Sequence, residues 1–225
     1  MKKAFTLLEL VFVIVIIAIL SVAVIPRLSN NSLQEAAIQL VSHIRYTQHL
    51  AMIDDVYSSN DINWYKKRWQ LIFSRTISPD STVGYSIFSD IATASGTTTA
   101  GDVDIEEVAT NPQDKNKLLT GGYSHAIHSD NLKVTKKLNL ELSYGIDDVR
   151  FTGGCSGLRL SFDYLGRPIK GDLDSMTGPY HAGTKRLIHD NCIITLYSGL
   201  NSIAIKIVPE SGYSCIINEN LECIE

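Results

Sequence analysis

The sequence predicts an α+β fold, in which a long N-terminal α-helix, transmembrane in its first half and amphipathic in its second, precedes an antiparallel β-sheet domain. Apolar residues run almost unbroken over 5–25 and then recur every three or four positions to about residue 55, as on a helix. From residue 64 they recur at every second position, as in strands with one buried face. No strand pattern alternates with a second long helix, which argues against a parallel α/β fold. The expected parts are therefore a span at 5–25, its helical extension at 26–55 and a β domain at 56–225.

The composition excludes several classes of protein. With 225 residues, 44% of them hydrophobic, and a mean hydropathy of +0.05, the chain is neither disordered nor a multi-span membrane protein. Its 20 basic and 24 acidic residues give a net charge of −4, so no global positive field attracts nucleic acid.

The first apolar segment is long enough to cross a membrane. Only Thr6, Glu9 and Ser21 interrupt it, and as a helix it measures roughly 31 Å, close to the thickness of the hydrocarbon core. Lys2 and Lys3 precede it. The preference of basic residues for the cytoplasmic side therefore predicts a cytoplasmic N-terminus and an external domain from residue 27 onward.

A cleaved secretory signal peptide and a plain membrane anchor are the alternatives to a specialised span. Ser21-Val22-Ala23 loosely resembles a signal-peptidase site. The apolar run is, however, longer than the ~7–15 residues of a signal peptide's core. Glu9 in hydrocarbon also costs about 2.5–3.5 kcal/mol. An acid at that position indicates a function or a partner.

The N-terminus, Lys2-Lys3-Ala4 followed by Phe5-Thr6-Leu7-Leu8-Glu9-Leu10 and an aliphatic run, resembles that of type IV prepilins and type II secretion pseudopilins. The resemblance implies that a prepilin peptidase removes a leader of residues 1–4, cutting between Ala4 and Phe5, and methylates the new N-terminus at Phe5. The family usually has Gly where this chain has Ala4. It also implies a single-pass protein of the inner membrane with a periplasmic domain, and assembly with other pilins or pseudopilins on an inner-membrane platform that extracts the subunit into a filament.

Glu9 has an expected role in that assembly. After cleavage the amino group of Phe5 is positive, and Glu9 lies one helical turn further along. In a stack of parallel helices the carboxylate of one subunit can pair with the amine of its neighbour, which compensates both buried charges. Recognition by the peptidase is the other role open to Glu9.

The second half of the helix is expected to be amphipathic. Pro26 removes a backbone donor and predicts a kink near the membrane surface. A turn of Asp54, Asp55 and polar residues through Asp61 ends the helical pattern. The apolar stripe that should cover the β domain comprises Leu33, Ala36, Ala37, Leu40, Val41, Ile44, Thr47, Leu50 and Ala51.

Several strands can be predicted by their alternation. Residues 69–73 and 83–87 each show an apolar face, and 192–197 with 203–208 are typical of a hairpin. In 158–164 the expected buried residues are Leu158, Leu160, Phe162 and Tyr164, with Arg159, Ser161 and Asp163 in solvent. The polar middle of the chain, including the loop 92–102, is expected to be an exposed excursion.

The distal sequence shows a looser resemblance to H-type minor pseudopilins and related minor pilins. It rests on the helix 40–55, on Leu160-Ser-Phe-Asp-Tyr-Leu-Gly-Arg-Pro168 and on Glu210-Ser-Gly212. The resemblance implies a β-sandwich ectodomain and a minor subunit of a type II secretion pseudopilus or type IV pilus. The alternative is a DNA-uptake or adhesive minor pilin. Against DNA, residues 27–225 carry 18 basic and 23 acidic residues, with one concentration of lysines at Lys115, Lys117, Lys133, Lys136 and Lys137.

No motif predicts an enzyme. Cys155 in Gly153-Gly-Cys-Ser-Gly157 leads into a strand, whereas a nucleophile elbow leads into a helix. His125 and His128 lack a third ligand at metal-site spacing, and 178–185 misses the phosphate loop by one residue. We expect no cofactor. Calcium, which stabilises loops in some pseudopilins, is the remaining possibility, at Asp102, Asp104, Glu106 and Glu107 or at Asp172 and Asp174.

The four cysteines fall in the domain expected outside the cytoplasm, so two disulfides should form. Three pairings are possible. We favour Cys215 with Cys223, because a short polar loop can bring their Cα atoms within the ~4.4–6.8 Å of a disulfide. A similar C-terminal loop closes in many pilins. Cys155 then pairs with Cys192, and the two other pairings stay open.

Overall fold

The computed structural model describes residues 7–75, 81–90, 103–123, 127–171, 173, 176, 178 and 186–224, without the side chains of 21–31 and 75. The helices are α1 (Leu7–Ile53) and α2 (Leu140–Tyr144), with 3-10 turns η1 (Trp64–Lys66) and η2 (Lys136–Leu138). The strands are β1 (Trp69–Arg75), β2 (Val83–Ser89), β3 (Asp148–Gly153), β4 (Arg159–Phe162), β5 (Pro168–Lys170), β6 (Cys192–Ser198), β7 (Asn201–Ile207), β8 (Ser214–Ile217) and β9 (Cys223–Ile224).

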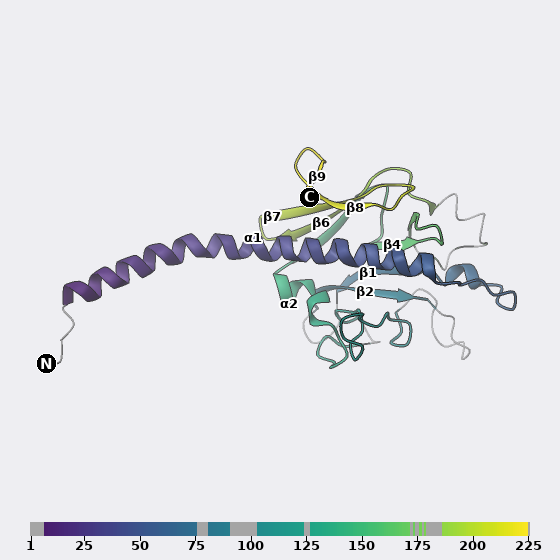
Figure 1. Ribbon diagram of the computed structural model, residues 1–225, viewed down its shortest axis with the longest axis horizontal. Helices are drawn as coiled ribbons and strands as arrows, with labels where there is room; N and C mark the ends of the chain where they lie inside the picture. Colours follow the sequence, from purple (N-terminus) through teal and green to yellow (C-terminus); the bar gives the residue numbers. More distant parts are fainter. Residues whose placement is uncertain are drawn as a thin grey trace.

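The predicted α+β architecture is confirmed. One sheet has the strand order β2-β1-β4-β5 and the other β3-β6-β7-β8-β9, and all pairs are antiparallel. The predicted hairpin is β6–β7, in register at Ile194 opposite Ile205. The C-terminal half of α1 packs against strands of both sheets, while its N-terminal half extends away from the domain (Figure 1).

The predicted stripe of α1 forms the centre of the core. Leu40, Ile44 and Thr47 are completely buried, and Leu50 is half-buried. The stripe meets side chains of both sheets in one cluster that includes Leu71, Tyr85, Phe162, Ile194 and Ile205. The helix ends at Ile53, and the Asp54 amide makes the last backbone hydrogen bond, to Leu50 O at 3.0 Å.

The backbone of α1 is helical on both sides of Pro26. The Pro26 side chain lies outside the described residues, so the kink stays a prediction.

The in-and-out assignment for residues 158–164 was partly wrong. Leu160 and Phe162 are buried as expected, but so are Ser161 and Asp163, while Leu158 is 38% and Tyr164 64% exposed. β4 is an inner strand with both faces covered, and Ser161 Oγ donates to Ile169 O at 3.3 Å. Leu158 has a positive φ of 55° and lies in the turn before the strand, so it does not continue the alternation.

Over the described residues 103–123 and 127–144, the polar middle of the chain is an exposed excursion only in part, at 112–116 and 130–133, and much of the rest is buried against the domain. This segment runs along the free edge of β2, where Ile87 N donates to Leu119 O and Gly121 N to Tyr85 O. These hydrogen bonds satisfy backbone N–H and C=O groups of the edge strand that could otherwise pair with a strand of another chain. Gly121 is required there, since a Cβ would clash with the backbone carbonyl of Leu138. The predicted loop 92–102 lies outside the described residues.

Both disulfides are present with the favoured pairing. Cys155–Cys192 joins the end of β3 to the start of β6, with Cα atoms 5.0 Å apart. Cys215–Cys223 closes the C-terminal loop between β8 and β9, with Cα atoms 5.6 Å apart. The first disulfide is buried and extends the pairing of two strands that are far apart in the sequence.

Candidate functional site at the N-terminal helix

The described side chains from Leu7 to Leu20 make the first turns of α1 a largely apolar, exposed surface. Every described side chain from Leu7 to Leu20 is exposed, Leu7 by 82% and Ile17 by 57%. A continuous apolar surface of this kind marks a contact with protein or lipid. Over the residues that the structure describes, no helical stretch meets the length and hydropathy needed to cross a membrane.

The predicted site residues divide between described and undescribed parts of the chain. Ala4 and Phe5, at the expected cleavage site, lie outside the described residues. Glu9 is the acidic residue of the first turn of α1, and its side chain is exposed. The juxtaposition of Glu9 with the amine of Phe5 stays a prediction.

A polar cluster fixes the second half of α1 to the domain. The Tyr85 hydroxyl lies 2.6 Å from His43 Nδ1 and accepts a hydrogen bond from Gln39 Nε2 at 3.0 Å. The Tyr144 hydroxyl donates to Gln39 Oε1 at 2.9 Å. His43 Nδ1 and the Tyr85 hydroxyl share one hydrogen bond, and the tautomer of the neutral ring decides which of the two donates. Burial lowers the pKa of His43 to about 4, which keeps the ring neutral, and raises the pKa of Tyr85.

A second set of contacts ties α1 to two turns at its C-terminal end. Gln48 Nε2 donates to Gly166 O at 2.7 Å and to Ser211 O at 2.8 Å. Gly166 and Gly212 both have a positive φ, and a Cβ on either would come within 3.0 Å of the Met52 or Gln48 side chain. The two distal motifs, 160–168 and 210–212, therefore converge on one glutamine of the helix. Both turns could be recognised from the sequence, but the role of Gln48 could not, because its two acceptors lie 118 and 163 residues away.

Alternative sites find little support in the described part of the chain. Cys155 is in a disulfide and is not available as a nucleophile. His125, Asp102, Asp172 and Asp174 lie outside it, and the residues within it contain no group of three metal-binding side chains. The absence of a cofactor stays a prediction.

The lysine concentration is partly engaged within the molecule. Lys137 pairs with Glu35 on α1 at 3.2 Å, and Lys117 Nζ donates to Leu132 O. Both contacts hold the segment 103–144 in place. Two of the five lysines therefore already have partners in the fold.

Residues 1–25 match the prokaryotic N-terminal methylation motif. The chain begins with a prepilin methylation motif. This class III signal peptide is that of the type IV pilin and pseudopilin family, whose proteins are structural, and it implies peptidase processing, membrane anchoring and pilus-like assembly. No curated protein and no solved structure matches the prepilin-like chain.

Proposed function

We propose that this prepilin-like chain is a minor subunit of a type II secretion pseudopilus or a type IV pilus. The match of residues 1–25 to the methylation motif carries the proposal. In it, the peptidase cuts between Ala4 and Phe5 and methylates Phe5, and the mature subunit stays in the inner membrane through residues 5–25 until it is extracted. The domain then faces the periplasm, where its two disulfides persist.

The exposed half of α1 is the proposed assembly surface. Its described apolar side chains, from Leu7 to Leu20, are exposed in the monomer, so association with the helices of neighbouring subunits would bury them without any change in the domain. The other half of α1 is fixed to the domain by hydrogen bonds. Gln39 and His43 contact Tyr85 on β2, and Gln48 contacts the turn at Gly166. If the helix moves during filament assembly, the domain therefore moves with it as one unit.

Glu9 supplies the axial register in this proposal. The only acid in the exposed apolar stretch would pair with the methylated amine of Phe5 of a neighbour, because N-methylation keeps the positive charge. Axial slippage would leave both charges unpaired in an apolar environment, which costs several kcal/mol. The role as a minor subunit rests on the distal motifs around Gly166 and Gly212.

Substitution of Glu9 tests the assembly role. Glu9→Leu should leave the chain inserted and folded but reduce its co-purification with partner pilins at least tenfold. Glu219→Leu, the same change at an exposed glutamate of the C-terminal loop, should co-purify normally. Normal co-purification of Glu9→Leu with a processed N-terminus would overturn the assembly role, and an unprocessed Glu9→Leu chain would instead assign Glu9 to peptidase recognition.

A further inference from the structure

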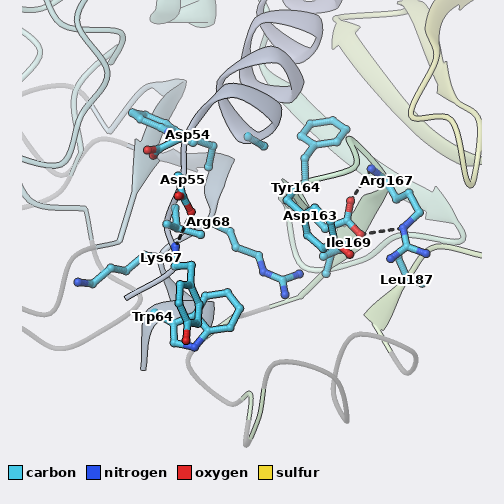
Figure 2. Close-up of a pocket in the computed structure, with 15 residues that line it drawn as sticks. Asp54, Asp55, Trp64, Lys67, Arg68, Asp163, Tyr164, Arg167, Ile169 and Leu187 are labelled. Atoms are coloured by element: carbon cyan, nitrogen blue, oxygen red, sulfur yellow. Dashed lines mark hydrogen bonds and ion pairs between the residues drawn. The ribbon is translucent and has the colours of Figure 1, made fainter. Parts of the chain in front are cut away.

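A cavity of about 460 Å³ opens beside the C-terminal end of α1 (Figure 2). Residues 51–57 form one wall, the segment from η1 to the start of β1 forms another, and the turn between β4 and β5 closes it. Its lining begins at Ala51, near the end of α1 at Ile53, whereas the methylation motif covers residues 1–25. A ligand bound here would not compete with helix assembly.

Aromatic side chains line the cavity and leave it accessible. Both tryptophans of the chain, Trp64 and Trp69, belong to its lining. Tyr57 packs edge-on against Trp64 with ring centroids 5.3 Å apart. Tyr57 and Tyr164 are each 64% exposed, so the opening has an aromatic rim that could receive an apolar side chain.

The charged side chains of the cavity other than Arg68 have hydrogen-bond or ion-pair partners in the fold. Asp55 Oδ1, for example, accepts a hydrogen bond from Tyr57 N at 3.2 Å. Arg167 Nε pairs with Asp163 Oδ2 at 2.7 Å, and Lys67 pairs with Asp61 at 2.6 Å. Asp54 accepts from Trp69 Nε1 at 2.8 Å. Arg68 uses its Nε to donate to Tyr65 O at 3.1 Å, and its two terminal nitrogens have no acceptor among the described residues.

The Arg68 guanidinium extends into the cavity, on the side of Trp64 that faces Asp163 (Figure 2). Burial lowers the pKa of Arg68, and the charge of Asp163 opposes this shift. Arginine remains charged under these conditions. The cavity therefore presents a half-buried planar cation whose fork of donors is available to an anion.

The surrounding acids select among anions. Asp54, Asp55 and Asp163 all line the cavity, so a dianionic phosphate would be repelled more strongly than a carboxylate with a single charge. A carboxylate also matches the guanidinium in a bidentate geometry. The aromatic rim favours a carboxylate that has an apolar side chain beside it.

We propose that the cavity binds the C-terminal residue of a polypeptide partner, with the terminal carboxylate on Arg68 and an aromatic side chain between the rim tyrosines. An acidic side chain next to an aromatic residue offers the same chemistry from the interior of a chain. The C-terminal residue is preferred because it places carboxylate and side chain on one Cα, which suits a small cavity with one available cation. The site does not depend on the role of the N-terminal helix.

Tryptophan fluorescence of the full chain in detergent micelles tests the proposal, because both tryptophans report on this cavity. The probes are acetyl-Gly-Phe with a free carboxylate, its C-terminal amide, and acetyl-Phe-Glu-amide. We expect a saturable change with the free acid, and at least tenfold weaker binding for both other peptides. Arg68→Gln should weaken binding of the free acid at least tenfold and Arg68→Lys less, while Arg150→Gln, at an exposed arginine on β3, should leave it unchanged.

Four results would overturn the proposal. Equal binding of acid and amide would remove the carboxylate from recognition, and full binding by a folded Arg68→Gln chain would remove Arg68. Equal or tighter binding of acetyl-Phe-Glu-amide would reassign the site to acidic side chains. If no probe binds to the wild-type chain at millimolar concentration, the cavity is not a carboxylate site.

Discussion

At the level of single residues, His43 makes the free energy of unfolding of the domain depend on pH. Its ring is mostly buried where α1 packs on β2, and its Nδ1 shares a hydrogen bond with the Tyr85 hydroxyl. The pKa of His43 is lowered to about 4 by burial, against about 6.5 in an unfolded chain. Between these values the unfolded state binds a proton that the native state excludes, so stability falls as pH decreases through this window.

This window gives a measurable difference between pH 7 and pH 5. The shift predicts that His43 alone removes about 2 kcal/mol of the free energy of unfolding over that change. His43→Gln should lose this part of the pH dependence, whatever its effect at pH 7. His49→Gln, at an exposed histidine of the same helix, should retain it. Urea unfolding followed by tryptophan fluorescence measures both, and an equal pH slope in wild type and His43→Gln would refute the assignment.

Residue burial could be predicted from the sequence where it follows from the local helical spacing. Leu33, Leu40 and Ile44 were found from helical spacing. The partners of His43 and Gln39 were not, because Tyr85 and Tyr144 are 42 and 105 residues away from them. A hydrogen bond between such distant residues leaves no periodic signal, although a polar residue at the edge of an apolar stripe indicates that a partner is present.

At the scale of elements, the two disulfides are expected to contribute unequally. Cys155–Cys192 closes a separation of 37 residues and Cys215–Cys223 one of 8. By loop entropy the first should stabilise the domain by about 4 kcal/mol and the second by about 2.5 kcal/mol. The first also joins β3 to β6, whereas the second closes an edge loop.

Paired serine substitutions compare the two disulfides. Cys155→Ser with Cys192→Ser should lower the free energy of unfolding by more than Cys215→Ser with Cys223→Ser. Chemical denaturation of both double variants gives the two values, and each is the control for the other. A larger loss from the C-terminal pair would show that loop length does not decide their contributions.

The positions of the strands could be predicted from the sequence better than the exposure of their side chains. β1, β2, β6 and β7 were found from alternation, which a single covered face produces. Alternation predicted the wrong exposure for Ser161 and Asp163, because β4 is covered on both of its faces. It gave no signal for the segment 103–144, because that segment packs on β2 through isolated bridges that have no regular spacing. When a segment without regular secondary structure covers a strand, the spacing of hydrophobic residues does not reveal it.

At the scale of the whole molecule, the chain is divided along one helix. Its described side chains from Leu7 to Leu20 are exposed and mostly apolar, and residues 1–25 match the methylation motif. Its second half packs in the core of a disulfide-bonded domain. The candidate site at the N-terminus could be proposed from sequence because the motif is contiguous. The cavity around Arg68 could not, because its walls come from three separate segments.

The N-terminal mass of the mature protein is the decisive test of whether this chain is processed as a prepilin. If the chain is processed as a prepilin, the form extracted from membranes lacks Met1 to Ala4, begins at Phe5 and carries one additional methyl group on its α-amino nitrogen. Mass spectrometry of the intact protein and of its N-terminal peptide determines both features. A chain that retains Met1 to Ala4, or one that begins at Val24 after cleavage by a signal peptidase, would contradict the account.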